Sequence, residues 1–248
     1  MLVLASFDTH LFWVALSSGP YWKGALLALG LTCAALSAAV VIGFFLALGR
    51  ESRLRPVRTF VFFYNWIFRA TPTLLQLLFV WNALPQVSSV FSGSWFTPFI
   101  AAVVVLSLNE AAYMCEIIRA GLLSVDPGQE LAARALGLTR RQILRRVIIP
   151  QAIRIVIPPT GNEFITLLKL TSLASVISLQ ELLTASENLA AVKFQFIEAY
   201  SAALVYYLVI VSILMALQSR LERRFTWTSR ARARVTAPAV PAISHDAR

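Results

Sequence analysis

The sequence has little of what metal centres, disulfide frameworks and nucleotide sites are built from. It contains two cysteines and two histidines in 248 residues. Cys33 and Cys115 lie within apolar stretches, where packed thiols are expected, and His10 and His245 lie in terminal segments away from any metal-type spacing. A glycine-rich phosphate loop of the GxxxxGK[ST] kind is also missing. We therefore expect no metal, no cofactor and no enzymatic activity in this chain.

Acidic residues are scarce as well, at 12 against 22 lysines and arginines, which gives a net charge of +10. An excess of this kind is compatible with nucleic-acid binding. However, 58% of the residues are hydrophobic and the mean hydropathy is +0.72, values that argue against a soluble globular domain. The basic residues also gather in alternate segments of the chain, so we expect a lipid bilayer and not nucleic acid as the partner.

Several apolar stretches reach about twenty residues, the length of a transmembrane helix. Backbone polar groups must satisfy one another in lipid, so helices are the expected spanning form. We predict an all-α membrane protein with a transmembrane domain over residues 21–225, a short N-terminal segment over 1–20 and a disordered tail over 226–248. The five transmembrane helices are predicted at residues 22–49, 57–82, 97–118, 159–179 and 199–217.

The arginines predict the orientation of these five helices. They are concentrated at residues 50–58, around the segment 119–154 and at 220–234, whereas residues 83–96 carry no charge. The remaining connection contains one base, Lys193, against three glutamates. Because basic residues concentrate in cytoplasmic loops, we predict an outside N-terminus and an inside C-terminus.

A polar, arginine-rich segment at residues 121–150 interrupts the apolar pattern and cannot lie in hydrocarbon. Asp126 is placed to cap a helix, with Gln129 three residues later. Gly137 then ends a helix of about ten residues. Residues 139–142 (TRRQ) form a second capping box. A loop with such well-marked helix ends indicates a cytoplasmic element that docks onto a partner.

Charged and polar residues inside the predicted spans are the candidates for function, because they are expensive in lipid. Arg69 lies near the middle of the second span, just before Pro72, which breaks the helix. In the third span Asn109 and Glu116 are seven residues apart and share a face, which favours a polar path. The alternatives are a snorkelling arginine at a structural kink, and ion pairs that serve only stability.

The fourth span starts with a helix break at residues 157–161, where two prolines precede a glycine. A helix that restarts near Thr160 would point free N–H groups at an anion such as a carboxylate. Glu163, Lys169 and Thr171 follow on the same helix and add charges and a hydroxyl. The alternative is that these groups only hold helices together.

Taken together, these segments resemble the membrane permease subunits of ABC importers for polar amino acids, the histidine, glutamine and arginine type. The likeness covers about residues 19–225. The polar segment resembles the cytoplasmic EAA loop of that family, with Ala132 and Ala133 as the alanines and Gly137 as the glycine. The strings RATPTLLQ, NEAAYMCEIIRAG, IPQAIRIVIPPTGNEF and LLKLTSL resemble the amino-acid branch.

Two positions depart from the family pattern. The glutamate of the EAA triplet is replaced by Leu131, and Glu130 stands one residue earlier on a neighbouring helix face. The family string LLKDTSL has an aspartate where this chain has Leu170. The family implies that this lysine–aspartate pair and a preceding glutamate hold the charged backbone groups of the substrate, so one carboxylate of that set is missing here.

The resemblance implies a permease that carries a polar amino acid, or a close derivative, across the bacterial inner membrane. Its implied partners are two cytoplasmic ATPase subunits that bind ATP–Mg, a second permease subunit, which we expect to be a paralogue, and a periplasmic substrate-binding protein. We expect the residues for ATPase coupling to be Asp126, Gln129, Glu130, Ala132, Ala133 and Gly137, and those of the substrate path to be Arg69, Asn109, Glu116, Glu163, Lys169 and Thr171.

Two functions of other classes remain as alternatives at this point. One is a secondary transporter or channel that works without an ATPase, although such proteins are often longer and internally repeated. The other is a membrane scaffold without transport, which the charges within the spans argue against.

The predicted topology can be tested by cysteine labelling or reporter fusions. Ser88 and Ser92 should be accessible from the periplasm, whereas Thr139 and Thr228 should be accessible only from the cytoplasm, because arginine-rich segments stay inside. A cytoplasmic signal at Ser88 or Ser92 would contradict the five-span topology.

Overall fold

The computed structural model describes residues 7–235, and side chains as far as Arg224. Every element in this part of the chain is helical, as predicted. The elements are α1 (Thr9–Ser17), α2 (Gly19–Arg50), α3 (Arg55–Ala70), α4 (Thr73–Val87), η1 (Ser89–Ser92), α5 (Pro98–Leu123), α6 (Pro127–Ala135), α7 (Arg140–Ile143), η2 (Leu144–Ile148), α8 (Ile149–Leu170), η3 (Thr171–Ile177), α9 (Leu182–Lys193) and α10 (Phe196–Val235).

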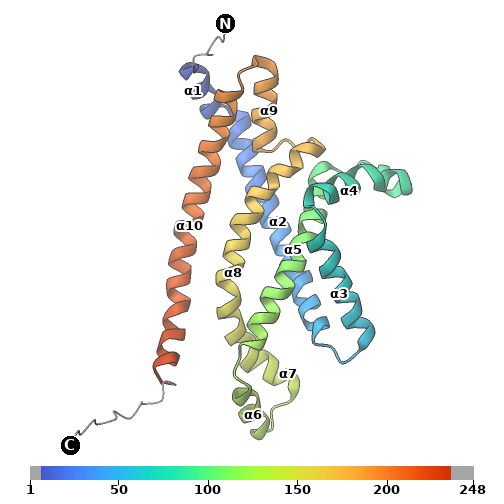
Figure 1. Cartoon of the computed structure of the whole chain (residues 1–248), viewed down its shortest axis with the longest axis vertical. Coiled ribbons are helices and arrows are strands. Elements are labelled where there is room, and N and C mark those ends of the chain that lie inside the picture. The colour runs from blue at the N-terminus through green and yellow to red at the C-terminus, as the bar shows by residue number, and fades with distance from the viewer. Residues whose placement is uncertain (1–6, 236–248) are drawn as a thin grey trace, which may run out of the picture.

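The long helices form an elongated bundle in which the chain passes back and forth along the long axis (Figure 1). Helices α2, α5 and α10 run in one direction, and α3 and α8 return. Helix α1 lies at one end and the short helices α6 and α7 lie at the other.

The central contact of the bundle is between α2 and α5, which pack along most of their length. Small buried residues line both helices, including Ala35 and Ala39 on α2 and Ala111 and Ala112 on α5. Helices in membranes associate through close van der Waals packing, which small side chains permit. The alanine-rich sequence of these two spans therefore places them at the centre of the fold.

Three helices in the described part are long and apolar enough to cross a membrane, namely α2, α5 and residues Phe196–Arg224 of α10. A fourth crossing is obtained if Arg140–Ile177 and Leu182–Lys193, which meet at a bend of 47°, are counted as one broken span. Helix α4 is apolar but shorter. The three strongest spans agree with the prediction, and the total of five remains a prediction.

The predicted span at 57–82 is two helices and not one. Helix α3 ends at Ala70, and α4 begins at Thr73 after the break at Pro72 and projects away from the bundle (Figure 1). The amide of Asn109 on α5 donates to the Phe68 carbonyl at 2.9 Å. The amide of Gln76 donates to the same carbonyl at 3.2 Å and to the Thr71 hydroxyl at 2.7 Å. These bonds satisfy backbone groups that the break leaves free.

The predicted start of the fourth span is wrong. Helix α8 begins at Ile149 and continues through Pro158 and Pro159, so no free helix N-terminus faces the bundle at Thr160. The prolines lie within the helix but remove two N–H donors, so the Arg154 and Ile155 carbonyls lack their usual helical partners. The Thr160 hydroxyl donates to the Val156 carbonyl at 2.8 Å, and the Gln218 amide of α10 donates to the Pro158 carbonyl at 2.6 Å.

Helix α10 lies at the edge of the bundle (Figure 1). It continues to Val235 and therefore extends into the segment 226–248 that we predict to be a disordered tail. Residues 1–6 and 236–248 lie outside the described part of the chain.

The central packing gives a stability prediction with a control on the same helix. A Cβ atom at Gly43 of α2 would lie 2.7 Å from the Met114 Cβ and 3.0 Å from the Cys115 nitrogen, whereas a Cβ at Gly30 would meet nothing within 4 Å. We expect Gly43→Ala to lower stability by about 1–3 kcal/mol, as overpacking does. Gly30→Ala should be neutral or stabilising because alanine favours helix. Thermal unfolding of the purified protein in detergent measures the difference, and equal melting temperatures for the two variants would contradict this packing.

Candidate functional site

The loop between α5 and α8 forms the short helices that the sequence predicts. The Asp126 carboxylate caps α6 by accepting from the Gly128 N–H at 2.7 Å. Gly137 adopts a φ of +73°, and the Gly137 and Leu138 N–H groups donate to the Arg134 and Ala133 carbonyls. This is the Schellman arrangement, which satisfies the last carbonyls of the helix. The capping box of Thr139 and Gln142 is also present.

Helix α6 presents an exposed surface of mixed character. Ala133 is buried, while Gln129 and Ala132 are exposed. Leu131 is 66% exposed and Leu136 is 81% exposed. Glu130 does not replace the missing triplet glutamate on this face, because it forms an ion pair with Arg134 one turn away. Two large apolar side chains on a short polar helix are favourable only if another surface covers them.

A cavity of about 550 Å³, lined by charged and apolar side chains, lies between the α6–α7 region and the ends of the long helices. The turn between α2 and α3 lines one side of this cavity with Glu51 and Arg53, and the loop lines the other with Glu130 and Arg140. Glu51 also receives a hydrogen bond of 2.7 Å from Arg119 near the end of α5. The bond joins the end of α2 to α5, and the α2–α3 turn and the α6–α7 loop line the same cavity.

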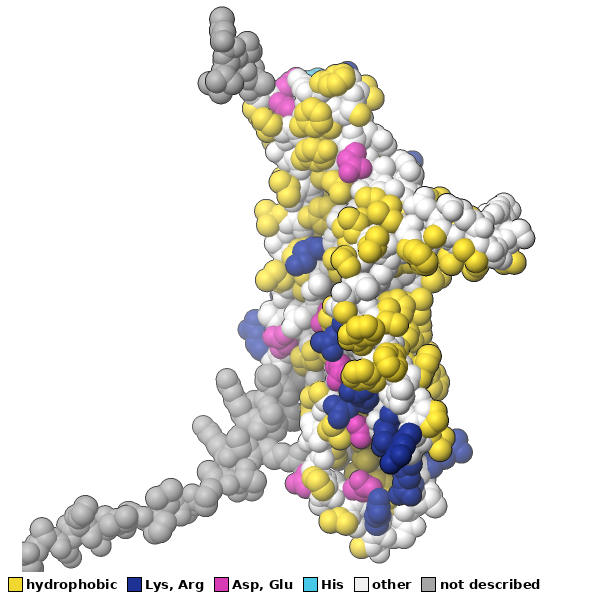
Figure 2. Space-filling view, turned by 45° about the vertical axis from the view of Figure 1, so that its right-hand side comes forward, with side chains coloured by type: hydrophobic (Ala, Val, Ile, Leu, Met, Phe, Trp, Pro, Cys, Tyr) yellow, Lys and Arg dark blue, Asp and Glu magenta, His cyan; other side chains and the backbone are white. Residues whose placement is uncertain are grey.

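Lysines and arginines gather over the end of the molecule that holds α6 and α7, while the middle is mostly apolar (Figure 2). The sequence supplies these charges from the α2–α3 turn and from residues 140–146. This distribution matches the predicted cytoplasmic side.

The structure brings together two of the predicted path residues, Arg69 and Glu116, in a cavity of about 420 Å³ between α3 and α5. The Arg69 guanidinium lies 5.3 Å from the centre of the Tyr113 ring, a cation–π arrangement. Glu116 accepts from the Asn65 amide at 3.2 Å and lies 4.0 Å from Arg119. Glu116 is thus already partly neutralised, whereas Arg69 has a ring for a partner and no acid among the described side chains.

Two other predicted path residues, Asn109 and Thr171, form hydrogen bonds with backbone carbonyls. Asn109 is buried, and its side-chain amide donates to the Phe68 carbonyl beside the break between α3 and α4. The Thr171 side chain is fully buried, and its hydroxyl donates to the Leu168 carbonyl at 2.7 Å. Neither side chain lines the Arg69–Glu116 cavity.

Glu163 and Lys169 both lie on α8, but they differ in environment. Lys169 is exposed near the end of the helix, and Glu163 is half-buried. Glu110 of α5 is 2% exposed, and its Oε1 atom has no hydrogen bond in the described structure. It is not among the candidate residues of the sequence analysis, because the face of α5 that meets α8 cannot be read from one sequence.

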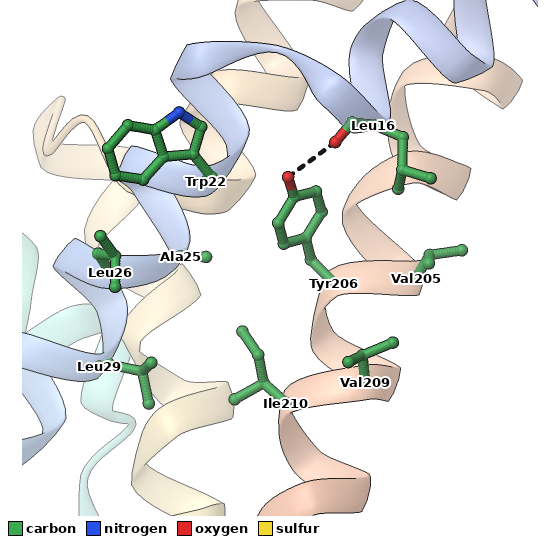
Figure 3. A pocket seen from close by; sticks show the side chains of 9 residues that line it. All are labelled: Leu16, Trp22, Ala25, Leu26, Leu29, Val205, Tyr206, Val209 and Ile210. Carbon is green, nitrogen blue, oxygen red and sulfur yellow. Dashed lines mark hydrogen bonds between the residues drawn. The ribbon is translucent and has the colours of Figure 1, made fainter.

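A separate groove of about 500 Å³ lies between α2 and α10 (Figure 3). Its lining side chains are apolar apart from the Trp22 indole N–H and the Tyr206 hydroxyl, which donates to the Leu16 carbonyl at 2.7 Å. Such a groove offers nothing to compensate the charges of a polar solute. It suits lipid acyl chains and is not a candidate for the polar path.

Comparison with known proteins decides the family. Residues 39–227 match the family described as the inner membrane component of binding-protein-dependent transport systems. The chain belongs to this family. It is therefore a non-enzymatic membrane subunit of a bacterial ABC transport system and is located in the inner membrane, as the sequence predicts.

Individual permeases in this family are similar over most of the chain. The arginine transport permease ArgU of Corynebacterium glutamicum is 40% identical over 81% of this chain, which spans 66% of ArgU. The L-cystine permease TcyB of Bacillus subtilis is 37% identical over 86% of this chain and 87% of its own length. The glutamine permease GlnP of Escherichia coli is 35% identical over 88% of this chain and 97% of GlnP.

Solved structures of ABC permeases share the fold. One described as an amino acid ABC transporter with histidines has a TM-score of 0.77 and 36% identity, covering 88% of this chain and 99% of that chain. The inward-facing methionine transporter MetNI has a TM-score of 0.67 at 20% identity, with the same coverage. Because the identity to MetNI is only 20%, this second match supports the permease fold and no further property.

Proposed function

We propose that this permease forms one half of the membrane channel of an ABC importer and carries a polar amino acid or a close derivative inward. The observation that carries the proposal is the set of charged groups on α3, α5 and α8 within a family whose similar members are named for amino-acid transport. A secondary transporter or channel without an ATPase is not favoured, because the loop built around α6 has no purpose without a cytoplasmic partner.

Two copies of a cytoplasmic ATPase subunit bind ATP–Mg and receive α6. The apolar side chains of Leu131 and Leu136 supply the contact area, and the capped ends of the helix fix its direction. An isolated helix of this length is marginal in water, so the caps and the bound ATPase stabilise it together. Asp126, Gln129, Glu130, Ala132, Ala133 and Gly137 are the proposed coupling residues.

The second permease subunit is a paralogue that carries an acid where this chain has Leu170. A free amino acid presents an anion and a cation, and a path of low dielectric constant must compensate both. On α8, Lys169 is left to meet the carboxylate because no helix N-terminus exists at Thr160. A periplasmic substrate-binding protein delivers the amino acid to the outer end of the pair.

Uptake in proteoliposomes tests the function as a whole. The chain is reconstituted with the ATPase, the second permease and the binding protein encoded beside it. We expect uptake of a polar amino acid that requires ATP on the cytoplasmic face. Uptake that is independent of ATP and of the ATPase subunit would favour the secondary transporter.

The coupling role gives a prediction for Gly137. Its φ of +73° disfavours any residue with a branched Cβ by about 1 kcal/mol or more, although open space surrounds the position. We expect Gly137→Val to displace α6 and to reduce transport and substrate-stimulated ATPase activity, with normal membrane insertion. Gly137→Asn is the control, since asparagine tolerates the left-handed conformation. Wild-type transport by Gly137→Val at normal expression would contradict the docking role.

The anion-binding role gives a prediction for Lys169. The side chain is exposed and has no hydrogen bond or ion pair among the described residues, so its removal should not disturb folding. We expect Lys169→Met to reduce the initial uptake rate at least about 10-fold, the scale of one lost charge-assisted hydrogen bond. Lys193→Met on α9 makes the same chemical change on an exposed helix and should transport normally. Equal uptake by both variants would remove Lys169 from the path.

A further inference from the structure

The cavity between the α2–α3 turn and the α6–α7 loop combines charged side chains with an apolar interior. Arg53 from the turn and Arg140 from α7 are exposed, whereas Ile143 is buried. The other aliphatic side chains that line the cavity deeper than its exposed residues, all half-buried, are Leu48, Leu122, Leu144 and Ile148. At about 550 Å³ the cavity has the size of a small-molecule site. Its lining suits a ligand that is charged at one end and apolar at the other.

Both acids of the lining are already engaged by arginines that lie outside it. The Glu51 carboxylate accepts a hydrogen bond of 2.7 Å from Arg119 near the end of α5. Glu130 forms an ion pair with Arg134 one turn further along α6. Neither Arg119 nor Arg134 lines the cavity. Because the charges of the two acids are largely balanced by these partners, the arginines of the lining decide the sign of the charge that the cavity offers to a ligand.

The two arginines of the lining, Arg53 and Arg140, come from elements that are far apart in the sequence. Their side chains form no ion pair and no hydrogen bond with any residue in the described part of the chain. Two like charges beside one cavity repel each other, and an anion between them removes that repulsion. A guanidinium group binds phosphate oxygens through two parallel N–H bonds, so phosphate is the anion that this pair fits best.

The cavity lies where the apolar spans end and the basic end of the molecule begins. Leu48 is two residues before the end of α2, and Leu122 is one residue before the end of α5. Lysines and arginines gather over this end, while the middle of the molecule is mostly apolar (Figure 2). Leu54, at the N-cap of α3, also lines the cavity and is 64% exposed. Basic pockets at the cytoplasmic ends of transmembrane helices are the places where anionic lipid headgroups bind.

We propose that this cavity is a phosphate-binding site in which Arg53 and Arg140 hold the phosphate group. A phospholipid headgroup of the cytoplasmic leaflet and a soluble phosphate present the same group to the two arginines. The aliphatic lining and the exposed Leu54 favour the lipid, because they offer an acyl chain a surface that a soluble phosphate does not use. A ligand held by both arginines joins the α2–α3 turn to the α6–α7 loop. The site shares no residue with the proposed substrate path and does not depend on which solute is transported.

Lipid binding to the full chain tests the site. The purified chain in detergent is titrated with phosphatidylglycerol, and native mass spectrometry resolves each bound lipid and gives its dissociation constant. We expect Arg53→Gln and Arg140→Gln each to weaken the tightest-bound lipid about 10-fold, the scale of one lost charge-assisted hydrogen bond. Arg58→Gln on α3 and Arg145→Gln on η2 remove the same charge from exposed positions that do not line the cavity, and they should bind as wild type does.

A second titration with inorganic phosphate, measured by calorimetry on the same protein, separates the two sources of the phosphate group. Weak binding of inorganic phosphate beside tight binding of phosphatidylglycerol assigns the site to the lipid. Inorganic phosphate that binds as tightly, and that needs the same two arginines, keeps the site and assigns it to a soluble phosphate.

Three results overturn the proposal. One is wild-type lipid and phosphate affinity in both Arg53→Gln and Arg140→Gln. Another is an equal loss in these variants and in the controls Arg58→Gln and Arg145→Gln, which would mean a general attraction between a basic surface and anionic lipid. The third is a lower melting temperature of Arg53→Gln or Arg140→Gln without lipid, because side chains that serve only a ligand leave the fold unchanged when they are removed.

Discussion

The cost of leaving a polar group unsatisfied in hydrocarbon is the constraint on which this structure depends. It accounts for the all-helical architecture and for the bonds that gather wherever a helix is interrupted. At the break between α3 and α4, the amides of Asn109 and Gln76 satisfy the Phe68 carbonyl. Beside the prolines of α8, the Thr160 hydroxyl and the Gln218 amide donate to the Val156 and Pro158 carbonyls.

The molecule combines a closely packed centre, formed by α2 and α5, with an exposed helix, α6. Helices α2 and α5 meet through alanines and Gly43, where even one methyl group would force a shift. The α6 region is exposed by contrast, since no other described residue covers Leu131 on the helix or Leu136 at its C-cap. Between the two regions, the ion pair of Glu51 and Arg119 joins the end of α2 to α5, while α6 packs against α7 and η2.

The charges of the spans fall into two neighbouring sets. Arg69 and Glu116 line a cavity between α3 and α5, while Glu110, Glu163 and Lys169 belong to α5 and α8. Helix α5 contributes to both sets, which places it between two candidate stages of one polar path. The apolar groove between α2 and α10 is lined by residues that belong to neither set.

The sequence by itself determined the fold class, the strongest spans and the coupling loop, because these follow from local signals. Apolar length predicts α2, α5 and α10, and the caps at Asp126, Gly137 and Thr139 act within a few residues of themselves. Only the tertiary structure showed that α8 continues through its two prolines and that Gln218, from the distant helix α10, donates to the Pro158 carbonyl. Likewise, it showed that the Asn109 and Thr171 side chains donate to backbone carbonyls. The contact between α5 and α8 was decided in the same way, because the pairing of two helix faces depends on how the helices cross and not on the spacing within either one.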